Sequence, residues 1–122
     1  MLIDEQPERF ALLEDSLLQY GHEIVARVSA SDDLIAAVEE AQPDVIIIDL
    51  DTPGRDTLEH MQVISRDRPR PIVMFTNDGD NATIERAVKA GVSAYIVGVM
   101  DWGKYHRARA VLIEAMSPSL PH

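Results

Sequence analysis

Runs of apolar residues that end abruptly in a polar residue are the clearest pattern in the chain. Val45 to Ile48 are four consecutive β-branched residues, and the run stops at the carboxylate of Asp49. The segment 71–76 repeats the pattern and stops at the hydroxyl of Thr76. Short apolar runs bounded by turn residues indicate strands buried on both faces, as in a parallel sheet.

Between these runs the apolar positions recur every three or four residues, which predicts amphipathic helices. Leu58, Met61 and Ile64 form one such stripe, and Leu34, Ile35 and Val38 another. Predicted helices cover 7–20, 32–41, 55–67, 81–90 and 101–116, and predicted strands include 22–28, 45–48 and 71–76, with a short first strand before Asp4 and a last one at Tyr95. Alternating strands and helices predict an α/β fold with a doubly wound, five-stranded parallel sheet.

Acidic residues collect where two of the predicted strands end. The chain opens with an apolar stub that runs into Asp4 and Glu5, and Asp49 ends the central run. In a parallel sheet these carboxylates converge on one edge, where ligands gather. Three clustered carboxylates favour a hard cation, and all-oxygen ligation suits Mg²⁺. Taken alone, Asp49 is favoured by about two to one as an acid that only opens a loop or caps a helix, and the acid pair and the strand that ends in Thr76 shift that balance. Thr76 could donate a hydrogen bond to a transferred phosphoryl group.

Composition narrows the possible functions. The 122 residues are 46% apolar and fit one globular domain. The net charge of −10 repels a phosphate backbone, so no nucleic-acid binding is expected of this chain. There is no cysteine, and neither a signal peptide nor a membrane-spanning run is visible, so we expect a cytoplasmic protein without membrane contact.

The whole chain resembles the receiver domain of two-component response regulators, a flavodoxin-like fold. The matching residues are Asp4, Glu5, Asp49, Pro53, Asp56, Thr76 and the stretch Gly91-Val92-Ser93-Ala94-Tyr95. The resemblance implies that Asp49 accepts a phosphoryl group from a histidine kinase, and that the chain is not an enzyme. It also implies Mg²⁺ held by Asp4, Glu5, Asp49 and the backbone carbonyl of Asp51. Thr76 would follow the phosphoryl group, Tyr95 would be the aromatic that swings inward, and a homodimer is plausible.

Two segments, 66–76 and 91–97, are most similar to the nitrate-responsive antiterminator branch of that family. Regulators of that branch carry an RNA-binding ANTAR domain after the receiver, so the resemblance implies an antitermination output that is not in this chain. We expect residues 1–116 to form the receiver domain and residues 117–122 to form a frayed tail.

Two other functions stay open. Gly98 stands where a receiver normally has a lysine, and this favours a pseudo-receiver, an interaction module that works without phosphorylation. Asp49-Leu50-Asp51 also fits the start of the haloacid-dehalogenase phosphatase signature, although Pro53 stands where that family has a threonine.

Overall fold

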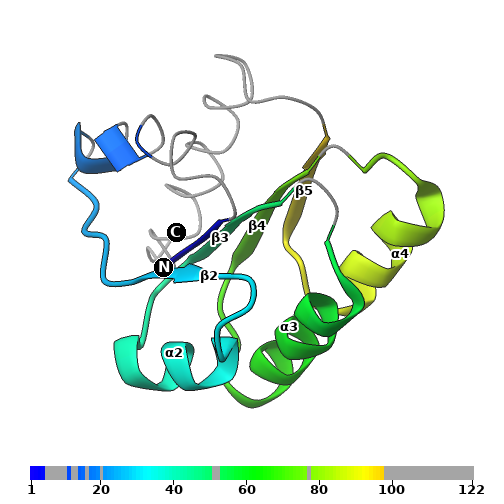
Figure 1. Ribbon diagram of the computed structural model, residues 1–122, viewed down its shortest axis with the longest axis horizontal. Coiled ribbons are helices and arrows are strands. Elements are labelled where there is room, and N and C mark those ends of the chain that lie inside the picture. The colour runs from blue at the N-terminus through cyan, green and yellow to red at the C-terminus, as the bar shows by residue number, and fades with distance from the viewer. Residues whose placement is uncertain are drawn as a thin grey trace, which may run out of the picture.

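Five parallel strands form one sheet in the computed structural model, in the order β2-β1-β3-β4-β5 (Figure 1). The structure describes residues 1–4, 11, 14–15, 17–19, 21–50, 53–76 and 78–97. Its elements are β1 (Leu2–Asp4), β2 (Arg27–Ser29), α2 (Leu34–Ala41), β3 (Ile46–Asp49), α3 (Arg55–Asp67), β4 (Ile72–Thr76), α4 (Asn81–Lys89) and β5 (Ala94–Val97). This confirms the predicted α/β class and the parallel sheet.

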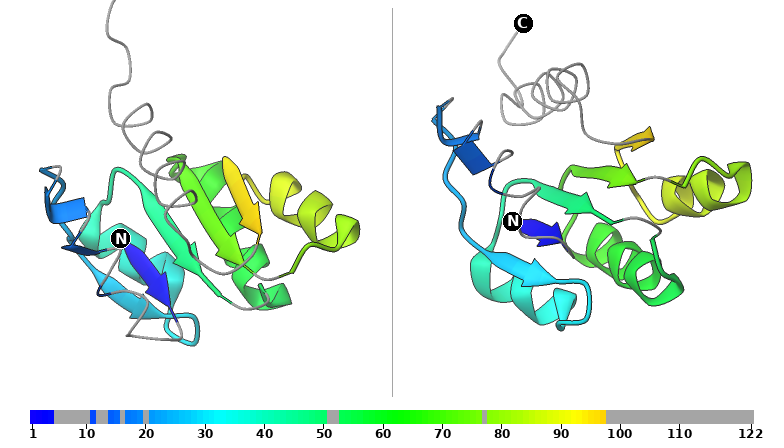
Figure 2. Two further views of the ribbon diagram at one scale, coloured as in Figure 1. Left: turned by 90° about the horizontal axis from the view of Figure 1, so that it is seen from above. Right: turned by 45° about the horizontal axis from the view of Figure 1, so that its top comes forward.

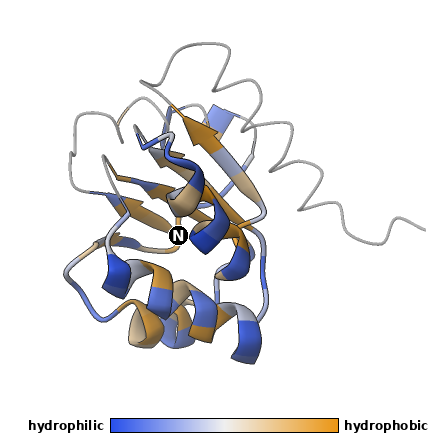
Figure 3. Cartoon of the chain, turned by 90° about the vertical axis from the view of Figure 1, so that its right-hand side faces the viewer, coloured by the Kyte–Doolittle hydropathy of each residue, from blue (hydrophilic) through white to orange (hydrophobic). Residues whose placement is uncertain are grey.

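Helices α2, α3 and α4 pack on the same face of the sheet (Figures 1 and 2). Their inward side chains are the predicted stripes: Leu34 and Val38 are buried from α2, and Leu58, Met61 and Ile64 from α3. A second apolar cluster lies on the opposite face of the sheet and consists of Leu2, Leu17, Val45, Ile47, Val73 and Phe75. The strands are coloured largely orange and the helices carry much blue in Figure 3, as expected for a sheet buried on both faces.

The second strand is shorter than the sequence predicts. Residues 22–28 alternate between exposed and half-buried, but the ladder with β1 holds only Arg27, Val28 and Ser29. The reason is that β1 itself has three residues, so it offers β2 only three positions to pair with. Of the predicted helix 7–20, the described residues 11, 14–15 and 17–19 are helical. The predicted helix 101–116 and the tail 117–122 lie outside the described residues.

No helix in the described part of the chain combines the length and the apolar character needed to cross a membrane.

The turn between α4 and β5 lies in close contact with α3. Gly91 has φ +95°, and a Cβ built on it would lie 2.1 Å from Ser65 Oγ in α3. The same Ser65 hydroxyl donates to the carbonyl of Ala90 at 3.0 Å. Only glycine satisfies both the left-handed backbone and this contact.

We predict that Gly91→Ala lowers the free energy of unfolding by about 2–5 kcal/mol, because left-handed strain adds to overpacking. Gly21→Ala is the matched control, since Gly21 also has a positive φ, +82°, but no atom within 4 Å of its added Cβ. It should lose only about 1–2 kcal/mol. Urea unfolding measures both, and equal losses would show that the contact with Ser65 is unimportant.

Candidate functional site

Two acidic side chains end adjacent strands at the carboxyl edge of the sheet. Asp4 is the last residue of β1 and Asp49 the last of β3, and the two are register partners. Register partners on parallel strands project to the same face, about 4.8 Å apart. Asp4 is 6% exposed and Asp49 1% exposed, and the Oδ2 atom of each is closed off from solvent. The sheet therefore brings together two of the carboxylates that the sequence predicts to converge.

This arrangement suits a hard cation. Two carboxylates buried side by side repel each other, and a positive charge between them relieves the repulsion. Within the described residues there is no cluster of three or more metal-ligating side chains, and Asp4 and Asp49 are the two acids that end strands at this edge. The other two predicted ligands, Glu5 and Asp51, lie outside the described residues. Mg²⁺ commonly binds one or two carboxylates and keeps several waters, so the residues present fit it.

Thr76 and Tyr95 lie on the neighbouring strands. Thr76 ends β4 and is 2% exposed, whereas Tyr95 lies within β5 and its half-buried ring packs on the core. Asp49 pairs with Phe75, so Thr76 stands one residue further along. Because side chains alternate along a strand, Thr76 projects to the face opposite the carboxylates. A group that both Asp49 and Thr76 contact must therefore lie over the edge of the sheet.

Hydrogen bonds link Thr76, Asp78 and Tyr95. The Asp78 backbone N–H donates to Thr76 Oγ1 at 3.1 Å, and the Tyr95 hydroxyl donates to the Asp78 carbonyl at 2.5 Å. A carbonyl only accepts, so the single proton of Tyr95 goes to Asp78, and the Asp78 backbone connects the two hydroxyl residues.

Burial and nearby negative charges raise the pKa of Tyr95. Burial raises the pKa of the phenol above its ordinary value of 10.0, and the nearby carboxylate of Asp78 raises it further. The hydrogen bond from Thr76 works in the opposite direction, and the charge of Asp80 raises the pKa again. Tyr95 is therefore protonated at neutral pH, and its proton is the one donated to the Asp78 carbonyl.

The sequence predicts Asp4, Asp49, Thr76 and Tyr95 at this edge but not Asp78. Asp78 is half-buried in the loop between β4 and α4 and contacts both hydroxyl residues. Its sequence signal is an acid two residues after a strand end, in a stretch of turn-forming residues. Such acids are common, so the signal identifies a turn but not the contacts.

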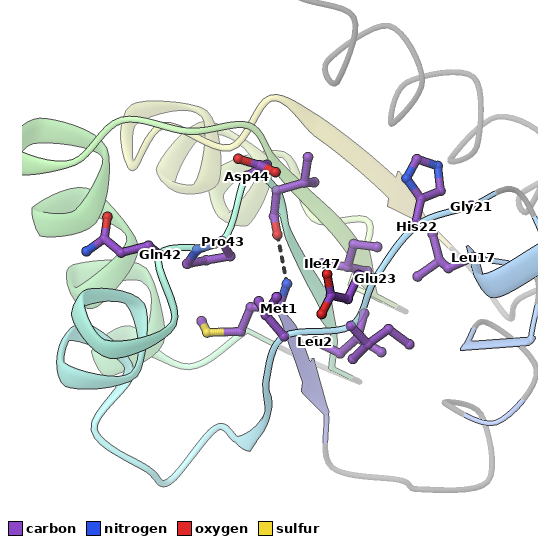
Figure 4. Close-up of a pocket in the computed structure, with 13 residues that line it drawn as sticks. Met1, Leu2, Leu17, Gly21, His22, Glu23, Gln42, Pro43, Asp44 and Ile47 are labelled. Atoms are coloured by element: carbon purple, nitrogen blue, oxygen red, sulfur yellow. Dashed lines mark hydrogen bonds between the residues drawn. The ribbon is translucent and has the colours of Figure 1, made fainter.

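A cavity of about 250 Å³ lies at the opposite, amino edge of the sheet (Figure 4). There the Met1 amino group donates to the Val45 carbonyl at 2.9 Å. Burial lowers the pKa of this amino group to about 6, although Asp44 acts to raise it. The strands separate this cavity from the acidic edge, so it is not part of the candidate site.

Comparisons with known proteins identify the family of the chain. A family model described as the response regulator receiver domain matches residues 1–106, which include all the residues discussed at the acidic edge. The transcriptional regulatory protein PdtaR of Mycobacterium tuberculosis is 33% identical over 85 residues, covering 70% of this chain and 42% of PdtaR. The transcriptional regulatory protein AfsQ1 of Streptomyces coelicolor is 30% identical over 97 residues, covering 80% of this chain and 43% of AfsQ1. The chain thus spans less than half the length of these relatives.

Solved structures show the same fold. A CheY-like receiver domain protein from Methanospirillum hungatei aligns with a TM-score of 0.77 at 18% identity, covering 95% of this chain and 94% of the other. The receiver domain of RcsB from Salmonella enterica, solved in the presence of the phosphomimetic BeF₃⁻, aligns with a TM-score of 0.75 at 20% identity, covering 93% and 86%. The chain belongs to the response regulator receiver domain family.

Proposed function

We propose that this receiver domain accepts a phosphoryl group on Asp49 from a histidine kinase. Receiver domains are signalling modules that interact with histidine kinases and often dimerise. The observation that carries the proposal is the pairing of Asp49 with Asp4 at the buried ends of adjacent strands, beside the strand that ends in Thr76. A nucleophilic carboxylate, a charge-bearing neighbour and a hydroxyl donor are the groups that phosphoryl transfer needs.

The chemistry is a substitution at phosphorus. A carboxylate oxygen of Asp49 attacks the phosphorus atom and forms a new P–O bond, while the bond to the donor breaks and its electron pair leaves with the donor. Receiver domains generally bind Mg²⁺ in their acidic pocket, where the ion neutralises charge on the phosphoryl oxygens. Asp4, Glu5, Asp49 and the carbonyl of Asp51 would hold it here. The Thr76 hydroxyl donates a hydrogen bond to a phosphoryl oxygen.

An alternative is a pseudo-receiver that binds partners without phosphorylation. Gly98, in place of the usual lysine, is the feature that favours it. Such a chain would keep the fold and the buried acids without using Asp49 as a nucleophile.

We infer that the output is control of transcription, and more narrowly antitermination through an ANTAR domain outside this chain. In support, PdtaR and AfsQ1 are named transcriptional regulatory proteins, and segments 66–76 and 91–97 resemble the antiterminator branch. Each relative is more than twice as long as the part that matches this chain. An output domain would correspond to the part of the relatives that this chain does not match.

We predict that wild type gains one phosphoryl mass with Mg²⁺ and acetyl phosphate, and that hydroxylamine removes it. Asp49→Asn should not gain it, because an amide is a poor nucleophile. Asp44→Asn is the matched control, since Asp44 is an exposed acid two residues before the start of the same strand. Intact-protein mass spectrometry measures all three. An unmodified wild type after hours of incubation would favour the pseudo-receiver.

We predict that Mg²⁺ at concentrations on the order of millimolar shifts the amide NMR signals of Asp4, Glu5 and Asp49, because the cation relieves repulsion among clustered carboxylates. Asp4→Asn should weaken binding about tenfold or more, since it removes a direct ligand. Asp44→Asn should bind as wild type does. Shifts that spread evenly over the surface, or no shifts, would refute a magnesium site at this edge.

We predict that beryllofluoride, which mimics the phosphoryl group, causes only a small conformational change at Thr76 and Tyr95 in wild type. Gly98→Lys should enlarge that change. A phosphoryl group adds about two negative charges, and a lysine contact to it is worth about 1.5–3 kcal/mol. Tyr95 is already hydrogen-bonded to Asp78, and moving its ring would break that bond, so we expect the ring to move little. NMR signals of Tyr95 and Thr76 report the change. Full switching of wild type that Lys104→Ala abolishes would show that Lys104 replaces the missing charge.

A further inference from the structure

We propose that Asp78 is a positioning residue for phosphoryl transfer: its carboxylate, anchored to the first turn of α4, fixes its backbone N–H against the Thr76 hydroxyl. This inference rests on the proposed function and adds a residue that sequence patterns do not identify. Asp78 does not touch the phosphoryl group; it acts through Thr76.

Both carboxylate oxygens of Asp78 are held. Oδ1 accepts from the backbone N–H of Asp80 at 3.0 Å, and Oδ2 accepts from the hydroxyl of Thr83 at 3.2 Å. Thr83 is 3% exposed, and its oxygen in turn accepts from Arg86 Nη2 at 3.2 Å. The carboxylate is therefore joined at two points to α4, and one of its partners is buried and itself fixed.

This contact differs from an ordinary helix cap. Asp80 occupies the N-cap position of α4, and its own side chain makes no capping hydrogen bond. An N-cap side chain normally accepts from a backbone N–H two or three residues further along. Asp78 lies before the cap, and one of its two bonds goes to a side chain inside the helix. Its carboxylate thus ties the loop to the helix, in addition to satisfying one free N–H.

The backbone of Asp78 carries this constraint to the site. Its N–H donates to Thr76 Oγ1 at 3.1 Å, and its carbonyl accepts from Tyr95 at 2.5 Å. That N–H holds the hydroxyl oxygen of Thr76 in place, and from there the hydroxyl donates a hydrogen bond to a phosphoryl oxygen. A donor already in place stabilises charge as it develops, without reorganisation during the reaction. The proton stays on Thr76 throughout, so the atom balance of the transfer to Asp49 is unchanged.

The test measures the rate of phosphorylation by acetyl phosphate in the presence of saturating Mg²⁺. Asp78→Ala should slow it about tenfold, the rate equivalent of one charge-assisted hydrogen bond, with Mg²⁺ affinity unchanged. Thr83→Val keeps the shape of the side chain but loses the hydroxyl, and it should slow the rate about threefold. Asp78→Asn keeps an acceptor oxygen and should lie between wild type and Asp78→Ala.

Asp80→Ala is the matched control. It also removes one negative charge, two residues further along the chain, but the Asp80 side chain makes no capping hydrogen bond. Its rate should stay within about twofold of wild type. Thermal unfolding of every variant shows whether it is folded at the assay temperature. A slower rate in a folded variant then reports positioning and not a loss of stability. If Asp78→Ala does not fold, the comparison of Thr83→Val with Asp80→Ala decides.

The outcomes are distinguishable. Equal slowing by Asp78→Ala and Asp80→Ala would assign the effect to charge alone and overturn the positioning role. A wild-type rate in both Asp78→Ala and Thr83→Val would overturn it too, while leaving Asp49 as the acceptor. If wild type itself takes no phosphoryl group, the proposed function fails and the role of Asp78 fails with it.

Discussion

The burial of two like-charged carboxylates at adjacent strand ends is the constraint around which the site is built. Ile46, Ile47 and Ile48 are buried on both faces of the sheet, so β3 delivers Asp49 to the edge with almost no solvent contact. The three-residue β1 does the same for Asp4. Two carboxylates buried close together favour a bound cation, because the cation relieves their mutual repulsion. This burial fits the proposed magnesium site and the proposed phosphoryl acceptor.

The other half of the site is built from neutral hydroxyls and a loop. The Asp78 backbone N–H donates to Thr76, and the Asp78 carbonyl accepts from Tyr95. Contacts at the edge of the sheet and contacts at β5 are therefore linked through the backbone of one residue. Asp78 connects the same loop to α4 through Thr83. A change at the acidic edge can therefore reach α4 through hydrogen bonds between neighbouring residues.

Much of the fold could be predicted from the sequence, because burial on both faces forces continuous apolar runs in the strands and regular stripes in the helices. The same logic places Asp49 and Thr76 at strand ends. The predicted start of the second strand at His22 was too early, because pairing depends on the length of its neighbour, which periodicity does not report. The contacts of Asp78 and the approach of Gly91 to Ser65 arise from tertiary packing, and local sequence shows only turn-forming residues there.

The most direct test of phosphoryl transfer to this edge is to locate the modified residue. Borohydride reduction converts an aspartyl phosphate to homoserine, and peptide mass spectrometry after incubation with acetyl phosphate and Mg²⁺ identifies its position. Homoserine at position 49 alone is the expected result. Homoserine at position 4, or none anywhere in a protein shown to be folded and magnesium-bound, would contradict the assignment of Asp49 as the acceptor.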